Sequence, residues 1–597
     1  MCGFVGVVSS KNIDTAKLNK SDDYLTCRGP DQHKWKREDL NSSLKCILSF
    51  HRLSILDLSE EASQPMKSSQ FDNVIMFNGE IYNHLTLRKE MEKNGVKFHS
   101  SHSDTETLLL GFSIYGNDFI NKIEGQFAIV FIDKKNNLIK LYRDRLGQKP
   151  LYYSITKNKL IFSSNFKSVL VNKNSFELDE DQIANFLEFG AVVSPNTFDK
   201  NISKLQPGEV IEISYDPLKV VKRYKYWDLK KFVSNEKFES DKFFELFENS
   251  VYKRLLADVP VATLLSGGID STSITKALSN SNIDQINSFS IKNKDPKYDE
   301  SEWSGMVANK YNTNHLVETI DGKNLNLDHK KVIQSFDEPY SDPSIFPSFL
   351  IYEKISKNFK VAISGDGGDE LLGGYEKITS TMNKGFLNSS IVGVISKFLP
   401  DYLGTGGSLS SINSSKDDSF VSLTVDTKLI TLLSKESKLT YGENFLEKNI
   451  YGLKKYILSD YKFFLAELML LKVDRTSMAN SLEVRSPFLD HKLVEYMIST
   501  DMNFYDSNKT KSIMKEYLSE DFEKSFLNRK KMGFVFDLEN WIYTIQNEIR
   551  EEINSSKYFE WKRVESLFTF RTRINAIRIL KIFTVILFLR EYEEISN

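Results

Sequence analysis

The sequence predicts an α+β domain followed by a larger α/β domain. Three observations lead to this fold class. The chain has 597 residues, a length that suits two large domains better than one. Over residues 2–170, polar motifs separate strand-like segments from helix-like segments. From residue 261 onward, short apolar strands recur at roughly regular intervals, and the first of them runs into a glycine loop and a helix.

Composition narrows the classes of function. Acidic and basic residues nearly cancel, with a formal net charge of −2, so the chain lacks the basic stripe of a nucleic-acid-binding protein. The three cysteines, Cys2, Cys27 and Cys46, all lie near the start, which favours a reducing compartment. The first residues do not look like a signal peptide, and the apolar run at 582–589 is too short to span a bilayer. We therefore expect a cytoplasmic protein with no membrane partner; its oligomeric state stays open, a homodimer included.

The first reactive candidate is Cys2, directly after the initiator methionine. Once Met1 is removed, the free amine of Cys2 can take the proton of its own thiol, so no histidine is needed to activate it. Taken alone, Cys2 also suits a small buried residue at the start of a strand. Four polar motifs follow it in order: RGPD at 28–31, HRLSILD at 51–57, FNGEIYN at 77–83 and SDTE at 103–106.

Together with Cys2, these motifs resemble the glutaminase domain of the class II glutamine amidotransferases over most of residues 2–170. The resemblance implies an N-terminal-nucleophile hydrolase fold, in which two sheets lie between helix layers in the order αββα. It also implies that Cys2 attacks the side-chain amide of glutamine and forms a thioester. Asn78, through its side chain, and Gly79, through its backbone N–H, would hold the oxyanion. A hairpin turn at Asn78-Gly79 is the structural alternative, and both can hold together.

The same resemblance assigns the rest of the glutamine site. Arg52 suits a bidentate grip on the α-carboxylate of the substrate. Glu80 and Asp104 would accept from its α-ammonium group. Two nearby histidines, His99 and His102, have the spacing of neither a helical metal pair nor a zinc ribbon.

Several further features complete the first half of the chain. His33, His51, His84 and His315 look like scattered polar residues. The loop RDRLGQKPLYY at 143–153 matches the family pattern and is expected to be structural, where the two domains meet. Asn165 stands where relatives usually carry glutamate. A turn between strands at 205–209 and a charged stretch after it place a linker at 206–240, between a glutaminase domain at 2–205 and a second domain at 241–597.

The second domain opens with VATLLSGGIDSTS at 261–273, which reads as strand, loop and helix. The glycines allow close approach to an anion, and the helix N-terminus points its positive end at that anion. Asp270 suits phosphate that is carried with Mg²⁺. The loop lacks the lysine of a Walker loop and the spacing of a dinucleotide fingerprint. It resembles the PP-loop of the ATP pyrophosphatases, which split ATP into AMP and pyrophosphate to adenylate a carbonyl oxygen.

Three more motifs follow: SGDGGDELLGGY at 364–375, KVDRTSMA at 472–479 and SLEVRSPFLD at 481–490. Their order behind a cysteine glutaminase resembles that of the asparagine synthetase family over nearly the full chain. The resemblance implies an α/β PP-loop synthetase domain of the adenine nucleotide α-hydrolase-like class, with added helices. Residues 376–455 match no pattern and are expected to hold helices and a loop.

The full set of site residues of this domain follows from the resemblance. Mg²⁺ would bind Asp270 and Asp369, and Asp366 would belong to the catalytic set. The contacts to ATP and pyrophosphate would come from Leu265, Ser266, Gly267, Gly268, Asp270, Ser271, Ile291, Ser364, Gly365 and Lys511.

The implied reaction is that of an ATP-dependent carbon–nitrogen ligase with small-molecule substrates: glutamine, ATP and a carboxylate. Ammonia from glutamine must reach the activated carboxylate sheltered from water. Aspartate is the first choice of acceptor, with a carboxylate of a cell-envelope sugar or peptide as the alternative. Asparagine-forming members commonly read SGEG where Asp366 stands here, and some carry arginine at Pro343. The neutral charge disfavours a nucleic-acid-modifying PP-loop enzyme, and the full set of reactive positions disfavours a non-catalytic regulator.

Overall fold

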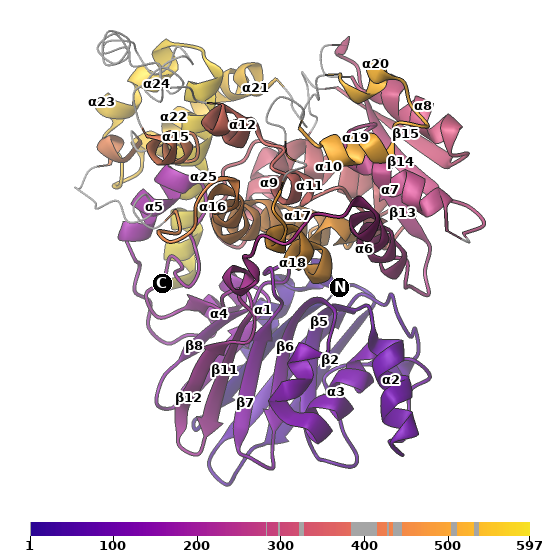
Figure 1. Ribbon diagram of the computed structural model, residues 1–597. Coiled ribbons are helices and arrows are strands. Elements are labelled where there is room, and N and C mark those ends of the chain that lie inside the picture. The colour runs from indigo at the N-terminus through magenta and orange to yellow at the C-terminus, as the bar shows by residue number, and fades with distance from the viewer. Residues whose placement is uncertain are drawn as a thin grey trace.

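The computed structural model describes residues 2–281, 283–296, 299–321, 327–383, 415–426, 429–433, 445–502, 505, 510–529 and 537–596. Figure 1 shows two bodies, with the N-terminal part of the chain in the lower one and the C-terminal part in the upper one. The region at 376–455 contributes helices α12 (Glu376–Met382) and α15 (Lys416–Ser422). Residues 384–414, which include much of the expected loop, lie outside the described residues.

The lower body holds two antiparallel sheets of six strands each. The first has the strand order β10 (Ser203–Lys204), β8 (Tyr152–Ile155), β9 (Lys159–Ser163), β1 (Gly3–Ser9), β3 (Lys45–Arg52) and β2 (Gln32–Asp39). The second has the order β12 (Leu218–Lys225), β11 (Glu209–Tyr215), β7 (Leu138–Arg143), β6 (Gly125–Asp133), β5 (Val74–Ile81) and β4 (Met66–Lys67).

The burial of β1 explains the layering. All seven of its residues are buried, because apolar side chains cover both of its faces. Phe4 and Val8 pack between the two sheets, whereas Val5 and Val7 pack on the opposite side with helices α1 (Thr15–Asp23) and α4 (Phe166–Val171). Helices α2 (His84–Lys93) and α3 (Asp104–Tyr115) cover the outer face of the second sheet. The predicted four-layer αββα arrangement is confirmed.

The first part of the segment predicted as a linker, residues 206–240, forms strands of the first domain in the structure. Residues 209–225 form β11 and β12, and β11 pairs with β7 from Val210 opposite Tyr142 to Ser214 opposite Leu138. Alternate residues Ile211, Ile213 and Tyr215 are buried between the sheets, which holds this hairpin in the first domain. The turn at Gly208 therefore opens a hairpin of the first domain, which extends beyond the predicted end at residue 205.

The upper body is built on a parallel sheet of five strands, as the sequence predicts for an α/β domain. Its order is β15 (Asn314–Ile320), β14 (Asn287–Asn293), β13 (Val261–Leu264), β16 (Val361–Ile363) and β17 (Glu483–Arg485). Helices α6 (Ser240–Lys253), α7 (Ile269–Ser279) and α18 (His491–Ser499) share one core beside the sheet. Helices α10 (Ile345–Ile355) and α17 (Leu470–Met478) share another with β13, β14 and β16.

Further helices surround this sheet, and the last of them returns to the first domain. They are α8 (Ser301–Lys310), α9 (His329–Gln334), α11 (Gly368–Leu372), α16 (Leu453–Ser459), the π-helix η10 (Asp460–Met469), α19 (Ser512–Tyr517), α20 (Lys524–Leu527), α21 (Leu538–Thr544), α22 (Gln546–Asn554), α23 (Trp561–Val564), α24 (Ser566–Thr569) and α25 (Arg573–Ser596). No helix in the described ranges combines the length and the apolar character needed to cross a membrane.

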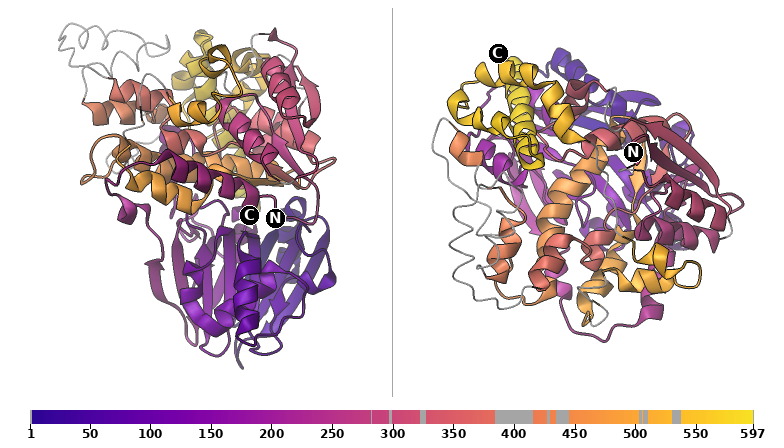
Figure 2. Two further views of the ribbon diagram at one scale, coloured as in Figure 1. Left: turned by 45° about the vertical axis from the view of Figure 1, so that its right-hand side comes forward. Right: turned by 90° about the horizontal axis from the view of Figure 1, so that it is seen from above.

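Figure 2 shows the two bodies in two further views. They share a hydrophobic core. Helix α25 packs against α4 and against α5 (Asp181–Phe189), both from the first domain. The ring of Phe588 lies 6.0 Å from that of Phe166 and 4.8 Å from that of Phe198. Apolar side chains of both domains therefore form one continuous core.

Two candidate active sites and the contact between them

The first site is built around Cys2, immediately before β1. The side chain of Cys2 is buried, and its backbone nitrogen donates a hydrogen bond to Asn78 Oδ1 at 2.9 Å. When Met1 is removed, this nitrogen becomes the terminal amine. Burial raises the pKa of the Cys2 thiol, so the thiol needs a base beside it. The amine of the same residue is in place for that role.

The oxyanion donors predicted on β5 lie in the same place. Asn78 is fully buried, and its Nδ2 has no hydrogen-bond partner among the described residues. A buried amide N–H without a partner costs about 1–3 kcal/mol, which a charged oxygen in the site would recover. A Cβ on Gly79 would lie 2.0 Å from the carbonyl oxygen of Gln126 on β6, so only glycine fits here.

Arg52 closes the site from the end of β3. Its guanidinium donates to the backbone carbonyls of Ser59 at 2.9 Å and of Leu56 at 3.3 Å, and also to that of Asp57. Cys2, Arg52, Gly79, Glu80 and Asp104 line one cavity of about 30 Å³. That volume holds about two water molecules. The hydrogen bonds of Arg52 hold residues 56–59 at the edge of this cavity.

The two predicted acceptors for an α-ammonium group are both buried. Glu80 Oε2 accepts from Arg485 Nη2 at 2.9 Å, and Glu80 Oε1 has no partner among the described residues. Burial raises the pKa of Glu80 well above its usual range, and Arg485 beside it opposes this rise. Asp104 accepts from the N–H of Ile81 at 3.3 Å, and burial raises its pKa as well. A bound ammonium group would stabilise the ionised form of both carboxyl groups.

A strand of the second domain completes this site, which the sequence analysis missed. Glu483 of β17 lines the Cys2 cavity, and Arg485 two residues later bonds Glu483 Oε1 at 2.6 Å as well as Glu80. Arg485 is fully buried and also donates to the carbonyls of Arg254 and Leu256, at 2.9 and 2.7 Å. The signal in the sequence was the pair of alternating charges in the motif LEVRSPFLD, because a buried strand carries charges only when they are paired.

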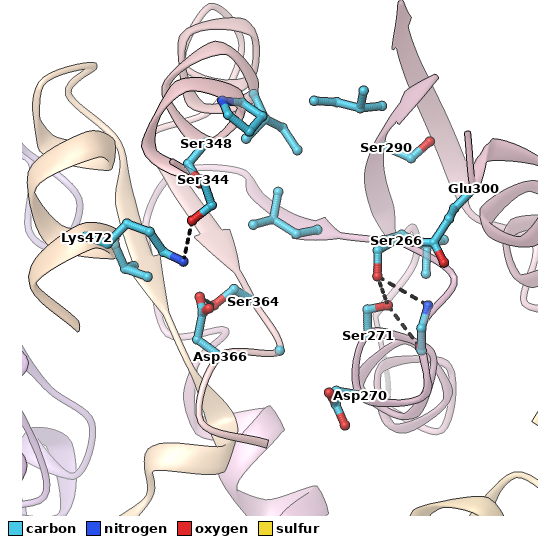
Figure 3. Close-up of a pocket in the computed structure, with 18 of the residues that line it drawn as sticks. Ser266, Asp270, Ser271, Ser290, Glu300, Ser344, Ser348, Ser364, Asp366 and Lys472 are labelled. Carbon is cyan, nitrogen blue, oxygen red and sulfur yellow. Dashed lines mark hydrogen bonds between the residues drawn. The ribbon is translucent and has the colours of Figure 1, made fainter. Parts of the chain in front are cut away.

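The second site lies at the carboxyl ends of β13, β14 and β16, where parallel sheets bind ligands (Figure 3). Its cavity has a volume of about 430 Å³, within the range of small-molecule sites. Most of the residues predicted for this site line it: Leu265, Ser266, Gly268, Asp270, Ser271, Ile291, Ser364 and Gly365 of the predicted nucleotide contacts, the predicted catalytic residue Asp366 and the predicted metal ligand Asp369. The other two predicted residues, Gly267 and Lys511, do not line the cavity itself.

The glycine loop has the predicted strand, loop and helix geometry. Ser266 Oγ accepts from the N–H of Gly268 at 3.2 Å and lies 3.1 Å from Ser271 Oγ. Gly267 has φ 75°, and a Cβ there would lie 2.7 Å from the nitrogen of Ser304. The first turn of α7 follows at once, so its free N–H groups and the serine hydroxyls face one space (Figure 3).

Two carboxylates converge beside this loop. Lys511 Nζ lies 2.5 Å from Asp270 Oδ2 and 2.6 Å from Asp369 Oδ1. Asp270 Oδ1 is buried and has no hydrogen-bond partner among the described residues. Oxygen donors that converge on one cation suit Mg²⁺, so these residues fit the predicted ion.

Two more groups in the cavity were not singled out from the sequence. Burial, followed by the charge of Asp369, raises the pKa of Glu370 to about 7. Lys472 Nζ lies 3.1 Å from Ser344 Oγ and 3.7 Å from Asp342 Oδ2, across the cavity from Ser266 (Figure 3). A carboxyl group that titrates near neutrality and a cation in the same cavity are typical of catalytic sites.

A small cavity lies between the two sites. Gln126 and Lys149 of the first domain line it together with Ser364 and Asp366 of the second. Val484 of β17 also lines it, and the preceding residue, Glu483, lines the Cys2 cavity. Each site therefore shares a wall, or an adjacent residue, with the space between them.

Charged residues hold the domains together around this space. Arg28 donates to both carboxylate oxygens of Asp474, at 2.9 and 3.0 Å, and to the carbonyl of Cys2 at 3.2 Å. Lys149 Nζ lies 3.8 Å from Asp474 Oδ1. Within the first domain, Arg143 fixes the loop that carries Lys149, because it donates to the carbonyls of Gly147, Lys149 and Leu205, at 2.9, 3.0 and 2.6 Å. The loop at 143–153 therefore lies where the domains meet, as predicted.

Comparisons with known proteins agree on both halves. A family model described as asparagine synthase matches residues 242–577, more than half of the chain, and one described as a glutamine amidotransferase domain matches residues 1–227. "Asparagine synthetase [glutamine-hydrolyzing] 1" of Bacillus subtilis is 29% identical, over 99% of this chain and 96% of that protein. "Putative asparagine synthetase [glutamine-hydrolyzing] 2" of Methanocaldococcus jannaschii is 31% identical, over 63% of this chain and 76% of that protein.

Among solved structures, a glutamine phosphoribosylpyrophosphate amidotransferase from B. subtilis aligns at 12% identity and a TM-score of 0.29, over 61% of this chain and 81% of that chain. A score this low carries no argument. The two family models do carry one, because the asparagine synthase model alone matches more than half of the chain and the amidotransferase model matches most of the rest. This protein belongs to the asparagine synthase family.

Proposed function

We propose that this protein is a glutamine-dependent asparagine synthetase. It hydrolyses glutamine at Cys2 and transfers the ammonia to a β-aspartyl-AMP made from aspartate and ATP. The products are asparagine, glutamate, AMP and pyrophosphate. One observation carries the proposal: a glutaminase-like cavity and a nucleotide-sized cavity lie on either side of a small space to which both domains contribute. We place the enzyme in the cytoplasm, where its small-molecule substrates are found.

At the first site, the thiol of Cys2 gives its proton to its own amine and its sulfur attacks the side-chain carbonyl of glutamine. Asn78 Nδ2 and the N–H of Gly79 donate to the oxyanion. The tetrahedral intermediate collapses to a thioester when the amine returns its proton to the departing ammonia. Water then attacks the thioester, and glutamate leaves with Cys2 restored.

At the second site, an oxygen of the acceptor carboxylate attacks the α-phosphorus of ATP and displaces pyrophosphate. The hydroxyls of Ser266 and Ser271 and the N-terminus of α7 hold the phosphates. Asp270 and Asp369 would hold Mg²⁺, which when bound neutralises charge on the leaving pyrophosphate. Lys511, which already lies between these carboxylates, is placed to pair with the same leaving group.

Ammonia then crosses the space between the sites. Val484, Leu489 and Leu470 supply apolar wall, and Gln126 Nε2 has no partner in the described part of the chain. An apolar path keeps ammonia unprotonated and therefore nucleophilic. At its far end lies Asp366, which accepts from Ser364 Oγ at 2.8 Å and faces the cavity.

Aspartate is the proposed acceptor. Lys472 can pair with its α-carboxylate, because Lys472 Nζ lies across the cavity from the glycine loop (Figure 3). Asp366 is one methylene shorter than the glutamate that asparagine-forming members commonly carry. This difference makes a larger carboxylate, such as one of the cell envelope, the second candidate.

The test measures pyrophosphate release by the purified protein with ATP, Mg²⁺ and glutamine, with and without L-aspartate, and identifies the product by mass. Aspartate-dependent pyrophosphate with asparagine formed supports the proposal. Glutamine hydrolysis without aspartate-dependent pyrophosphate moves the acceptor to another carboxylate. Cys2→Ala should lose glutamine-dependent synthesis and keep synthesis from added ammonia, whereas Cys27→Ala, at an exposed cysteine, should keep both.

A further inference from the structure

The large cavity of the second domain extends beyond the residues assigned to ATP. One wall is formed by α17, by α10 and by the loop before α10, and it carries Asp342, Ser344, Ser348 and Lys472. Figure 3 shows Lys472 and Ser344 on this side, with Ser266 of the glycine loop across the cavity. Because the phosphates of ATP bind at the glycine loop, this wall is left for the acceptor.

Asp342 and Lys472 place opposite charges side by side on this wall. Lys472 Nζ lies 3.7 Å from Asp342 Oδ2, which is beyond the length of a hydrogen bond. The exposed fraction of the side chain is 14% for Lys472 and 29% for Asp342, so solvent reaches both only in part. Among the described residues, Lys472 donates to one oxygen, Ser344 Oγ at 3.1 Å, whereas an ammonium group carries three donors. The pair therefore has hydrogen-bonding capacity left for a ligand.

Both side chains are held in place by their surroundings. Asp342 Oδ1 accepts from the backbone N–H of Ser344 at 2.8 Å, and Asp342 Oδ2 is the oxygen nearest to Lys472. The loop before Asp342 is anchored at Asp337, whose two carboxylate oxygens accept from Arg475 at 2.6 and 3.0 Å. Arg475 lies on the same helix as Lys472, so the loop and the helix are fixed relative to each other. A site that is held on packed elements keeps its geometry when a ligand arrives.

The spacing of this charge pair suits the head group of an amino acid. In an α-amino acid, the ammonium nitrogen and the carboxyl carbon are about 2.5 Å apart, because two bonds of about 1.5 Å meet at about 111°. Such a zwitterion, laid antiparallel beside the pair, brings its carboxylate to Lys472 and its ammonium group to Asp342. A carboxylate without an ammonium group beside it would pair with Lys472 and would be repelled by Asp342.

We infer that Asp342 is a specificity-determining residue of the acceptor site: it binds the α-ammonium group of the acceptor, while Lys472 binds the adjacent carboxylate. The inference rests on the proposed function, in which this cavity activates a carboxylate with ATP. The second carboxylate of the acceptor then points toward Asp366, which lines both this cavity and the space between the two sites. The acceptor is therefore a free amino acid with a second carboxylate, and Asp342 acts against a sugar carboxylate that has no ammonium group.

The experiment measures pyrophosphate release by the full-length protein with ATP, Mg²⁺ and added ammonium, so that the glutamine site is not needed. L-aspartate is the acceptor, and two competitors each lack one group: succinate lacks the ammonium group and β-alanine lacks the α-carboxylate. Asp342→Asn keeps an oxygen for the N–H of Ser344 and removes the charge. It should raise the KM for L-aspartate about tenfold or more and should not weaken inhibition by succinate. Lys472→Met should weaken binding of L-aspartate and of succinate and should spare that of β-alanine.

Asp328→Asn is the matched control. Asp328 also accepts from a backbone N–H, that of Lys331 at 3.1 Å, and it does not line the cavity. This variant should keep the parental KM for L-aspartate. The inference is overturned if Asp342→Asn also keeps the parental KM, or if its binding of L-aspartate and of succinate weakens equally, which is the result of general damage.

Failure of the proposed function gives a different result. A parent that releases no pyrophosphate with L-aspartate overturns the proposed function, and a panel of other carboxylates then identifies the acceptor. The inference stands if that acceptor carries a free α-ammonium group, and it is overturned if the acceptor carries none.

Discussion

Replacing Arg485 tests whether the second domain tunes the glutamine site. The structure gives Arg485 four hydrogen bonds, two of them to the carboxylates of Glu80 and Glu483. Arg485→Met keeps much of the volume and removes the charge. Glu80 then loses the one hydrogen-bond partner described for it and keeps its burial, so its pKa rises further and the neutral form is favoured. A neutral Glu80 can still accept a hydrogen bond but no longer pairs with a charged α-ammonium.

The expected loss in kcat/KM for glutamine follows from the replacement of a charged hydrogen bond at Glu80 by a neutral one. A hydrogen bond to a charged group contributes about 1.5–3 kcal/mol, and one between neutral groups about 0.5–1.5 kcal/mol. The difference, about 1–2 kcal/mol, corresponds to a fall of roughly 5- to 30-fold in kcat/KM for glutamine. Glutamate release from glutamine alone measures this, and pyrophosphate release with ammonia as nitrogen donor reports on the second site.

The pH profile separates this cause from general damage. As the pH rises through the pKa of Glu80, its charge returns, so the ratio of variant to parent kcat/KM should recover. Arg145→Met is the matched control, because Arg145 is also buried and donates to the carbonyls of Ile123 and Asn121, at 2.8 and 3.4 Å. It should show no such recovery. An Arg485→Met enzyme with parental kcat/KM for glutamine, or a pH-independent loss, would refute the reasoning.

Three other predictions rest on single contacts. Glu370→Gln should stabilise the fold by up to about 3 kcal/mol above pH 7 and should have no such effect below pH 4.5. The pKa of Glu370 is raised from 4.5 to about 7, so the stability of the parent falls as the pH rises across that interval. Urea unfolding of parent and variant at pH 5 and pH 8 measures the difference. Gly79→Ala places a Cβ 2.0 Å from Gln126 O and should abolish glutaminase activity while ammonia-dependent synthesis continues; a parental glutaminase rate would contradict this. Asp270→Asn should raise the Mg²⁺ concentration needed for half-maximal pyrophosphate release at least tenfold, and an unchanged requirement would remove Asp270 from the metal site.

Local chemistry made much of the fold predictable. The loop at 266–268 is encoded by an apolar strand, glycines and a helix that are adjacent in sequence, and β13 and α7 form where this pattern indicates. Cys2, Asn78 and Gly79 were predicted to meet, and they do so because β1 and β5 lie in facing sheets. In these cases the local residue types were enough to predict the structure around them.

Other features depend on partners that the sequence does not mark. Arg485 reaches Glu80 across 405 positions, and only the placement of β17 at the edge of the parallel sheet reveals the contact. His33 and His51 meet through strand register, which a shift of one residue would undo by turning one ring to the other face. The hairpin at 209–225 fell within the predicted linker because that prediction rested on the turn at 205–209 and on the charged stretch after it.

The packing of α25 against the first domain has a consequence for synthesis of the protein on the ribosome. Helices α4 and α5 present buried apolar side chains, such as Phe166, that α25 covers. Some 384 residues separate the end of α5 at Phe189 from the start of α25 at Arg573. At about 5–20 residues per second, this apolar surface stays uncovered for on the order of 20–80 s. The nascent chain must therefore be protected from aggregation until its final helix emerges, and a glutaminase half released early would expose the same surface.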